Sequence, residues 1–245
     1  MNDALAKQLD ALAARIRASA SEPPTRHRSD AAAALECHLD ALDERLRELQ
    51  RIGASARPIA DTRLQMARTL VGLGRGEAAW PLGREAFERF LELGEMELAA
   101  DACEVLFQSE QPGSIAALGQ GIWLAVACPI DPELTLELLS HLIDETPDDA
   151  DGAAVAATVA LFLADVRAQG RHRDDLMFFA TQLLGNVARR HSGIETPQEL
   201  DRWMERLELK EPEKFLVRLR NVIDVLVQDD WWFDREILQQ RLPFA

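Results

Sequence analysis

The chain has no tyrosine, few cysteines and no long uncharged hydrophobic run. Its three cysteines, Cys37, Cys103 and Cys128, are widely spaced and form no Cys-x-x-Cys pair, so the sequence predicts neither a zinc cage nor a disulfide framework. The most apolar stretch, 152–166, is too short for a membrane span, which needs about 18 or more apolar residues. The N-terminal residues lack the basic and apolar regions of a secretory signal. These absences favour a cytoplasmic protein with reduced thiols.

Signals for β-strands are also missing, because no run of β-branched residues alternates with polar ones. The 245 residues are 47% hydrophobic, so the chain is long and apolar enough to bury a sizeable core. Lysine occurs only at positions 7, 210 and 214, and arginine and alanine are abundant, which is typical of GC-rich bacterial genomes. The sequence therefore predicts an all-α protein.

The charge is strongly acidic, with 42 Asp and Glu against 27 Lys and Arg and a formal net charge of −15. Such a field repels phosphate backbones and anionic lipids. The richest basic stretches, 171–173 and 189–191, lie near expected helix ends, where cations offset the helix dipole. We therefore expect no binding to nucleic acid or membrane, and we expect any protein or peptide partner to have a basic surface.

Residues 1–52 are predicted to form a helical hairpin. Three leucines and Ile16 recur in a heptad pattern along 3–18, and five leucines do so along 30–51. The polar, proline-containing segment 19–29 is expected to link the two helices. Because a seam of two short heptad helices is too short to be stable without a partner, the hairpin is also predicted to support homodimerisation.

From about residue 58 onward, turn signals recur at a nearly constant interval. Helix pairs are predicted to start 37–41 residues apart, near residues 58, 95, 132, 173 and 212. A recurrent helix pair of this length is typical of a stacked α-α array. Residues 58–245 are therefore predicted to form one repeat domain of about five helix pairs.

Within this domain, residues 63–93 resemble a degenerate tetratricopeptide (TPR) repeat, whose helices cross at small residues. The small positions of the motif are occupied by Ala67, Gly74, Ala79 and Ala86, and those 35 residues further on by Ala102, Ser109, Ser114 and Gly121. The Trp and Tyr of the motif's first helix are absent, and Leu91 replaces its closing proline. The resemblance implies a right-handed α-α superhelix of stacked helix pairs, with a HEAT-like or unclassified array as the alternative.

Carboxylates four residues apart share one face of a helix and can hold Mg²⁺, so such pairs are the first enzyme signal to seek in an all-α chain. Two Asp-x-x-x-Asp spacings exist, Asp144/Asp148 and Asp230/Asp234, and the second lies in DDWWFD, which approaches the Asp-rich box of isoprenoid synthases. Pro147 interrupts the first pair, and no Asn/Asp…Ser…Glu box accompanies the second. A Mg²⁺-dependent all-α hydrolase or isoprenoid-type enzyme is therefore the alternative function.

One predicted helix also carries an acidic stripe, made of Glu85, Glu88, Glu92 and Glu95. Similar spacings occur in all-α nucleotide pyrophosphohydrolases, which need a second acidic box on a neighbouring helix. The next helix offers only Asp101 and Glu104. Because Arg84 and Arg89 interleave with the stripe, we interpret it as a solvated helix face.

The five histidines form no His-Glu-x-x-His motif, although Glu137 and His141 stand four residues apart and could ligate a metal. No Gly-x-Ser-x-Gly or phosphate-loop pattern is present. The sequence therefore predicts no catalytic, cofactor-binding or metal-binding residue and no cofactor.

The remaining signal is an aromatic triplet between acids, in QDDWWFD near the C-terminus. Phe233 continues the apolar stripe of the preceding helix and is expected to be buried. Trp231 and Trp232 are expected to differ in burial, because adjacent helical side chains point about 100° apart. Asp229 and Asp230 are expected to cap a short terminal helix, and the segment as a whole to close the end of the array.

These observations together predict a non-enzymatic cytoplasmic adaptor, chaperone or regulator that binds another protein. The expected binding residues are acidic and aromatic: Asp229, Asp230, Trp231, Trp232, Asp234, Glu85, Glu88 and Glu92. A structural, self-associating subunit is a third possibility. An enzyme would instead need carboxylates from two or more helices facing one deep pocket.

Overall fold

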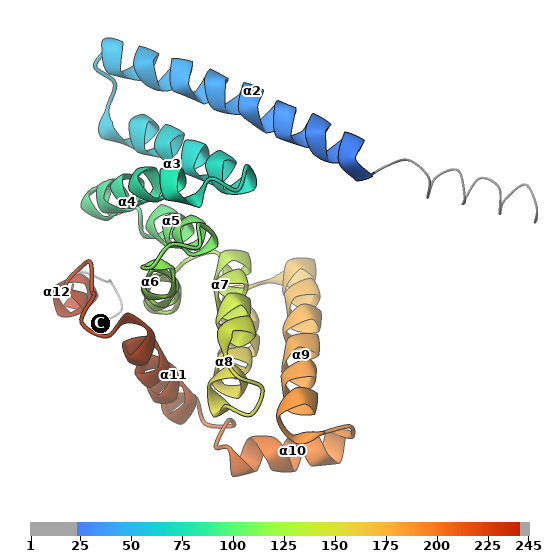
Figure 1. Ribbon diagram of the computed structural model, residues 1–245. Helices are drawn as coiled ribbons and strands as arrows, with labels where there is room; N and C mark the ends of the chain where they lie inside the picture. The colour runs from blue at the N-terminus through green and yellow to red at the C-terminus, as the bar shows by residue number, and fades with distance from the viewer. Residues whose placement is uncertain (1–23, 241–245) are drawn as a thin grey trace, which may run out of the picture.

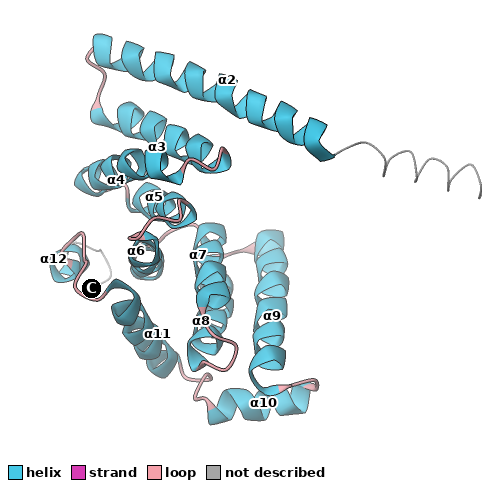
Figure 2. Cartoon of the chain, viewed as in Figure 1, coloured by secondary structure: helices cyan, strands magenta, loops and turns pink. Residues whose placement is uncertain are grey.

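The computed structural model describes residues 24–240, and within them every regular element is a helix (Figure 2). The all-α fold class is confirmed for this part of the chain, and none of its helices combines the length and apolarity that crossing a membrane requires. The helices are α2 (Pro24–Arg51), α3 (Ala56–Gly72), α4 (Gly76–Leu93), α5 (Met96–Gln108), α6 (Ser114–Ala127), α7 (Pro132–Glu145), α8 (Asp151–Arg167), α9 (Gly170–Ser192), α10 (Pro197–Arg206), α11 (Pro212–Val227) and α12 (Arg235–Gln240).

The starts of α7 and α10 have the side-chain caps that the sequence predicts. The Asp131 carboxylate accepts the backbone N–H of Glu133 at 2.8 Å, with proline at the first helical position of α7. Thr196 and Glu199 form a capping box at the start of α10. The helices α3, α5, α7, α9 and α11 begin within three residues of the predicted starts of the five units.

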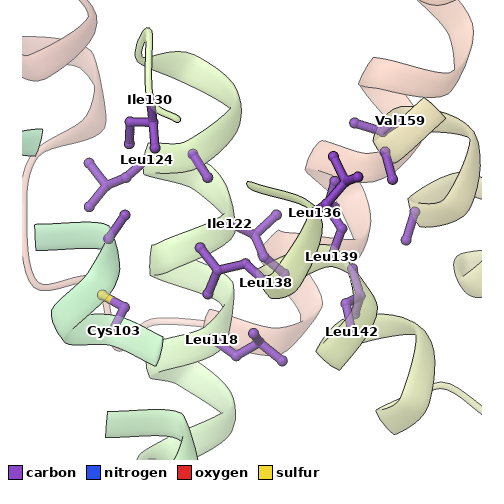
Figure 3. Close-up of a cluster of buried hydrophobic side chains, with 14 of the residues drawn as sticks. Cys103, Leu118, Ile122, Leu124, Ile130, Leu136, Leu138, Leu139, Leu142 and Val159 are labelled. Carbon is purple, nitrogen blue, oxygen red and sulfur yellow. The ribbon is translucent and has the colours of Figure 1, made fainter. Parts of the chain in front are cut away.

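From α2 to α9 the helices stack in chain order, each packing against the one before it (Figure 1). Some helices also contact the next but one in the stack: α3 contacts α5, and α7 contacts α9. The core runs through its centre, where apolar side chains of α5, α6, α7 and α8 interdigitate (Figure 3). Helix α8 is buried on almost every side over residues 153–160, which explains its run of alanine and valine.

Close helix packing accounts for the small residues behind the TPR resemblance. Seven of the eight small positions are buried: Ala67, Ala79, Ala86, Ala102, Ser109, Ser114 and Gly121. At Gly121, an added Cβ would lie 2.8 Å from the Cβ of Cys103 on α5 and 3.2 Å from Leu138 on α7. Gly74 is the exception, since it is exposed and adopts a left-handed turn conformation with φ of 70°.

The predicted stacking in chain order ends at α9. Helix α10 contacts α9, and α11 then returns to pack on α6 and α8 (Figure 1). This return needs a glycine, because a Cβ on Gly119 would lie 2.6 Å from Cγ2 of Val227. The prediction that the fifth helix pair extends the stack is therefore wrong, and α11 lies against its middle.

At the N-terminal end, α2 begins at Pro24, so residues 24–29 are helical rather than part of a linker. The expected helix 3–18 and the rest of the linker lie outside the described residues. The leucines of α2 face α3: Leu42 is buried, and Leu35 contacts Gly72. Because the leucines of α2 pack on α3 of the same chain, they do not by themselves require a second copy of the protein. Homodimerisation stays a prediction.

We predict that Gly119→Ala destabilises the protein by about 1–3 kcal/mol, because the new methyl group overpacks the contact with α11. The control is Gly185→Ala in α9, where the nearest atom to an added Cβ is an arginine tip at 3.9 Å. There, removal of a helical glycine should stabilise by up to about 1 kcal/mol. Urea unfolding monitored by circular dichroism measures both, and equal shifts for the two variants would contradict the close approach of α11 to α6.

Candidate functional site

The acidic and aromatic segment forms a loop between α11 and α12, and we refer to residues 228–234 as the aromatic loop. Helix α11 ends at Val227, and Gln228 turns the chain with a φ of 53°. The break before a short terminal helix is as predicted, but the cap is different. Asp234, rather than Asp229 or Asp230, accepts the backbone N–H of Ile237 at 3.0 Å at the start of α12.

A buried glutamine of α6 holds the aromatic loop by its backbone. Gln120 is fully buried; its Oε1 accepts the N–H of Trp232 at 2.9 Å, and its Nε2 donates to the carbonyl of Asp230 at 3.2 Å. Both ends of one amide are thus satisfied by the loop, which fixes its position on the array. Gln120 belongs to no sequence motif. The available signal was that it is the only long polar side chain in the apolar sequence of α6.

The side chain of Trp232 lies among residues of α4. Its indole meets Phe87 edge-on at 5.1 Å and Trp80 at 6.2 Å between ring centroids. The guanidinium of Arg84 stacks on the same ring, 3.6 Å from its centroid. The loop is therefore anchored against α4 and α6, within the length of the array, and the prediction that it closes an end is wrong.

Phe233 is only half-buried, which corrects the prediction that it belongs to the core stripe. The buried stripe of α11 runs at strict four-residue spacing and ends with the helix: Phe215, Leu219, Ile223 and Val227. Phe233 instead lies beside Phe87 of α4 and Trp123 of α6, with ring centroids 6.2 and 5.3 Å away. Helical spacing does not apply to it because the aromatic loop is not helical.

Trp231 and Trp232 are both half-buried, so the predicted difference in burial between them is not found. They differ in what they contact. Trp231 packs edge-on against Phe233 at 5.8 Å, and the guanidinium of Arg235 stacks on it at 3.8 Å. Each indole of the loop therefore already has an arginine of this chain on its face.

The acids of the loop stay at the surface. Asp229, Asp230 and Asp234 are exposed, and Asp230 lies close enough to Arg84 to act on its charge. Arg84 also pairs with Glu88 of α4 at 2.9 Å. Burial lowers the pKa of Arg84, and the carboxylates of Glu88 and Asp230 oppose that effect. Arg84 thus joins the acidic stripe to the aromatic loop.

Two other members of the predicted binding set are not part of this arrangement. Glu85 pairs with Arg63 of α3 at 2.7 Å, and Glu92 pairs with Arg89 at 2.5 Å. Both fit the interpretation of the stripe as a solvated face interleaved with arginine. The structure therefore brings together Glu88 and the loop residues, and it leaves Glu85 and Glu92 in ion pairs of their own.

A second cluster of polar side chains lies between α5 and α7, where Glu104, Glu137 and His141 converge. One ligand atom of each residue lies within 4.8 Å of those of the others. Glu104 is 2% exposed, and its Oε1 lies 3.9 Å from Nε2 of His141. Gln108 donates a hydrogen bond to Glu104 at 2.7 Å, and Arg68 lies 3.9 Å away.

The charges of this cluster shift one another's pKa values. The nearby Glu104 carboxylate raises the pKa of His141, against the effect of burial. Burial and the charge of Glu104 raise the pKa of Glu137. Burial also opposes ionisation of Glu104, but the neighbouring His141 and Arg68 outweigh it and lower the pKa. The cluster thus favours an ionised Glu104, while Glu137 and His141 hold their protons more tightly.

The Mg²⁺ pairs considered in the sequence do not form sites. Asp230 and Asp234 lie in and after a non-helical turn, so they do not share a helix face. Asp144 lies on α7, whereas Asp148 follows the end of that helix and pairs with Arg190 at 3.6 Å. The convergence of Glu104 with Glu137 and His141 could not be read from spacing, because 33 residues separate Glu104 from Glu137.

Comparisons with protein-family models, with curated proteins and with solved structures found no match to this chain. The TPR resemblance therefore rests on the small residues and helix lengths alone.

We predict that Trp232→Ala destabilises the protein by about 2–4 kcal/mol, because the indole fills the space between Trp80, Arg84 and Phe87. Its neighbour provides the control. The aromatic and cation contacts of Trp231 are with Phe233 and Arg235 of its own segment, so Trp231→Ala should cost less, about 1 kcal/mol. Guanidinium unfolding of both variants tests this, and an equal or reversed order would show that the loop is not anchored through Trp232.

Proposed function

We propose that the protein is a non-enzymatic adaptor, chaperone or regulator that binds another protein through the surface around the aromatic loop. The helical array, which we propose to be a TPR-like or HEAT-like superhelix, acts as the scaffold. The observation that carries the proposal is the anchoring of the loop: Gln120 and Trp232 hold it in place while Asp229, Asp230 and Asp234 stay exposed.

A pre-positioned loop lowers the entropic cost of binding, because its residues do not have to be ordered by the partner. Its exposed carboxylates add to a chain of net charge −15, which supports a partner with a basic surface. Glu88 adjoins the same surface through Arg84. We therefore propose Asp229, Asp230, Asp234 and Glu88 as the acidic contacts of this site.

The aromatic residues contribute differently from the sequence expectation. Trp231 and Trp232 were expected to contact the partner, but Arg235 and Arg84 of this chain already lie on their rings. The indoles therefore support the loop, and the partner is recognised mainly by charge and shape. Such binding should weaken as ionic strength rises, since exposed charges are screened within about 10 Å at 0.1 M salt.

A cytoplasmic setting and a bacterial source remain parts of the proposal. The first is supported by three free cysteines, two of them buried, which suit a reducing compartment. Self-association through residues 1–52 is a separate proposal, to which the described residues contribute only the packing of α2 on α3.

We predict that the double substitution Asp229→Asn/Asp230→Asn reduces partner capture by roughly tenfold, as a loss of about 1.4 kcal/mol would. The matched control is Asp174→Asn/Asp175→Asn, an adjacent pair of exposed aspartates on α9 that carries the same charge change. Quantitative affinity purification from cells that naturally express the chain measures both. Melting temperatures should be nearly unchanged, because all four side chains are exposed.

Two outcomes would contradict the proposal. Capture that is unchanged by the loop variant would place the binding surface elsewhere. Equal losses in the loop variant and the control would show that capture depends on overall charge rather than on the aromatic loop.

A further inference from the structure

We propose that Glu104, Glu137 and His141 form a binding site for a divalent transition-metal ion, with Zn²⁺ the best match. The site lies between α5 and α7 and does not depend on the function proposed for the aromatic loop. It departs from the sequence-based expectation of no metal-binding residue, because the third ligand comes from a helix that spacing does not connect to the other two.

The geometry is that of two neighbouring helices presenting ligands to one point. Glu137 and His141 are four residues apart and share a face of α7, and Glu104 approaches them from α5. Ligand atoms about 2.0–2.2 Å from a tetrahedral Zn²⁺ lie roughly 3.4 Å apart. The present separations, all within 4.8 Å, require an adjustment of about an ångström, which the exposed side chain of Glu137 can supply by rotation.

An unsatisfied polar atom points to a missing partner. Nε2 of His141 is buried and makes no hydrogen bond within the described residues, and the nearest carboxylate oxygen, on Glu104, is 3.9 Å away. Buried polar atoms nearly always have a partner, and an imidazole within reach of two carboxylates is suited to a metal ion that displaces its proton.

The charge balance of the cluster also favours a cation. Three carboxylates, Asp101, Glu104 and Glu137, gather near a single arginine, Arg68, which makes its close ion pair with Asp101 at 2.5 Å. A divalent ion placed between Glu104, Glu137 and His141 would offset the excess negative charge. It would also relieve the repulsion between Glu104 and Glu137.

Surrounding residues would hold the ligands in position. Gln108, one helical turn after Glu104, donates to its Oε1 at 2.7 Å, and ligating carboxylates in metal sites are usually held by such hydrogen bonds. The Phe107 ring lies 4.9 Å from the His141 imidazole and restricts its rotation. A cleft of about 540 Å³ is lined by His141, Phe107 and Asp144, so solvent reaches the His141 side of the cluster. Glu137 is exposed, which leaves its carboxylate open to an ion from solvent as well.

The ligand set selects the type of metal. Mg²⁺ and Ca²⁺ prefer oxygen ligands alone, whereas an imidazole with two carboxylates suits Zn²⁺ and related transition ions. Three protein ligands would leave a fourth position for water or another small molecule.

The test is calorimetric titration of the chelator-treated full chain with Zn²⁺, carried out with Cys37→Ser because Cys37 is an exposed thiol that could bind zinc by itself. We expect one equivalent to bind, and Glu137→Gln and His141→Gln each to weaken binding by roughly tenfold or more. Both positions are at least partly exposed, so these variants should fold, which circular dichroism verifies.

The matched control is Glu133→Gln/His172→Gln. This exposed pair also brings a carboxylate and an imidazole together, at 3.5 Å, but lies outside the cluster. It should leave Zn²⁺ binding unchanged. The proposal is overturned if no stoichiometric binding is observed, if the cluster variants bind as tightly as the parent, or if the control loses as much affinity as they do. Displacement of Zn²⁺ by an equal concentration of Mg²⁺ would overturn the choice of metal.

Discussion

Three consecutive residues of α6, Gly119, Gln120 and Gly121, define the packing on which the rest of the structure depends. Gly121 lets α6 approach α5 and α7, which builds the centre of the array. Gly119 lets α11 return and pack on the same helix. Gln120 then fixes the backbone of the aromatic loop. A side chain at either glycine would require neighbouring helices to move apart, because protein interiors tolerate little overpacking.

Arginine links this packing to the proposed function. Arg84 and Arg235 stack on the indoles of the aromatic loop, while Glu88 and Asp230 lie next to Arg84. In a chain of net charge −15, Arg84 and Arg235 hold the loop, and its exposed aspartates are left free to contact the proposed partner. The Glu104 cluster has the opposite balance, because Arg68 alone faces three carboxylates. The two sites are therefore proposed to attract different species, a basic protein and a metal ion.

Much of the candidate site could not be predicted from the sequence, because its residues come from separate helices. Asp229 to Asp234 stand out by composition, but Gln120, Trp80 and Arg84 do not, and only packing shows that they hold the loop. Likewise, Glu137 and His141 are a visible pair, whereas Glu104 joins them because α5 and α7 both pack on α6. The prediction for Phe233 was wrong because it extended helical spacing past a turn at Gln228.

The sequence by itself determined the all-α class, the starts of α3, α5, α7, α9 and α11 to within three residues, and most of the buried small residues. These properties depend on local chemistry, such as the Thr196–Glu199 capping box, and on apolar spacing within one helix. The tertiary structure alone decided that α11 leaves the stack and that the aromatic loop lies against its middle. That choice depends on complementary surfaces of residues about 110 positions apart, Gln120 and the loop, and local patterns carry no information about such pairings.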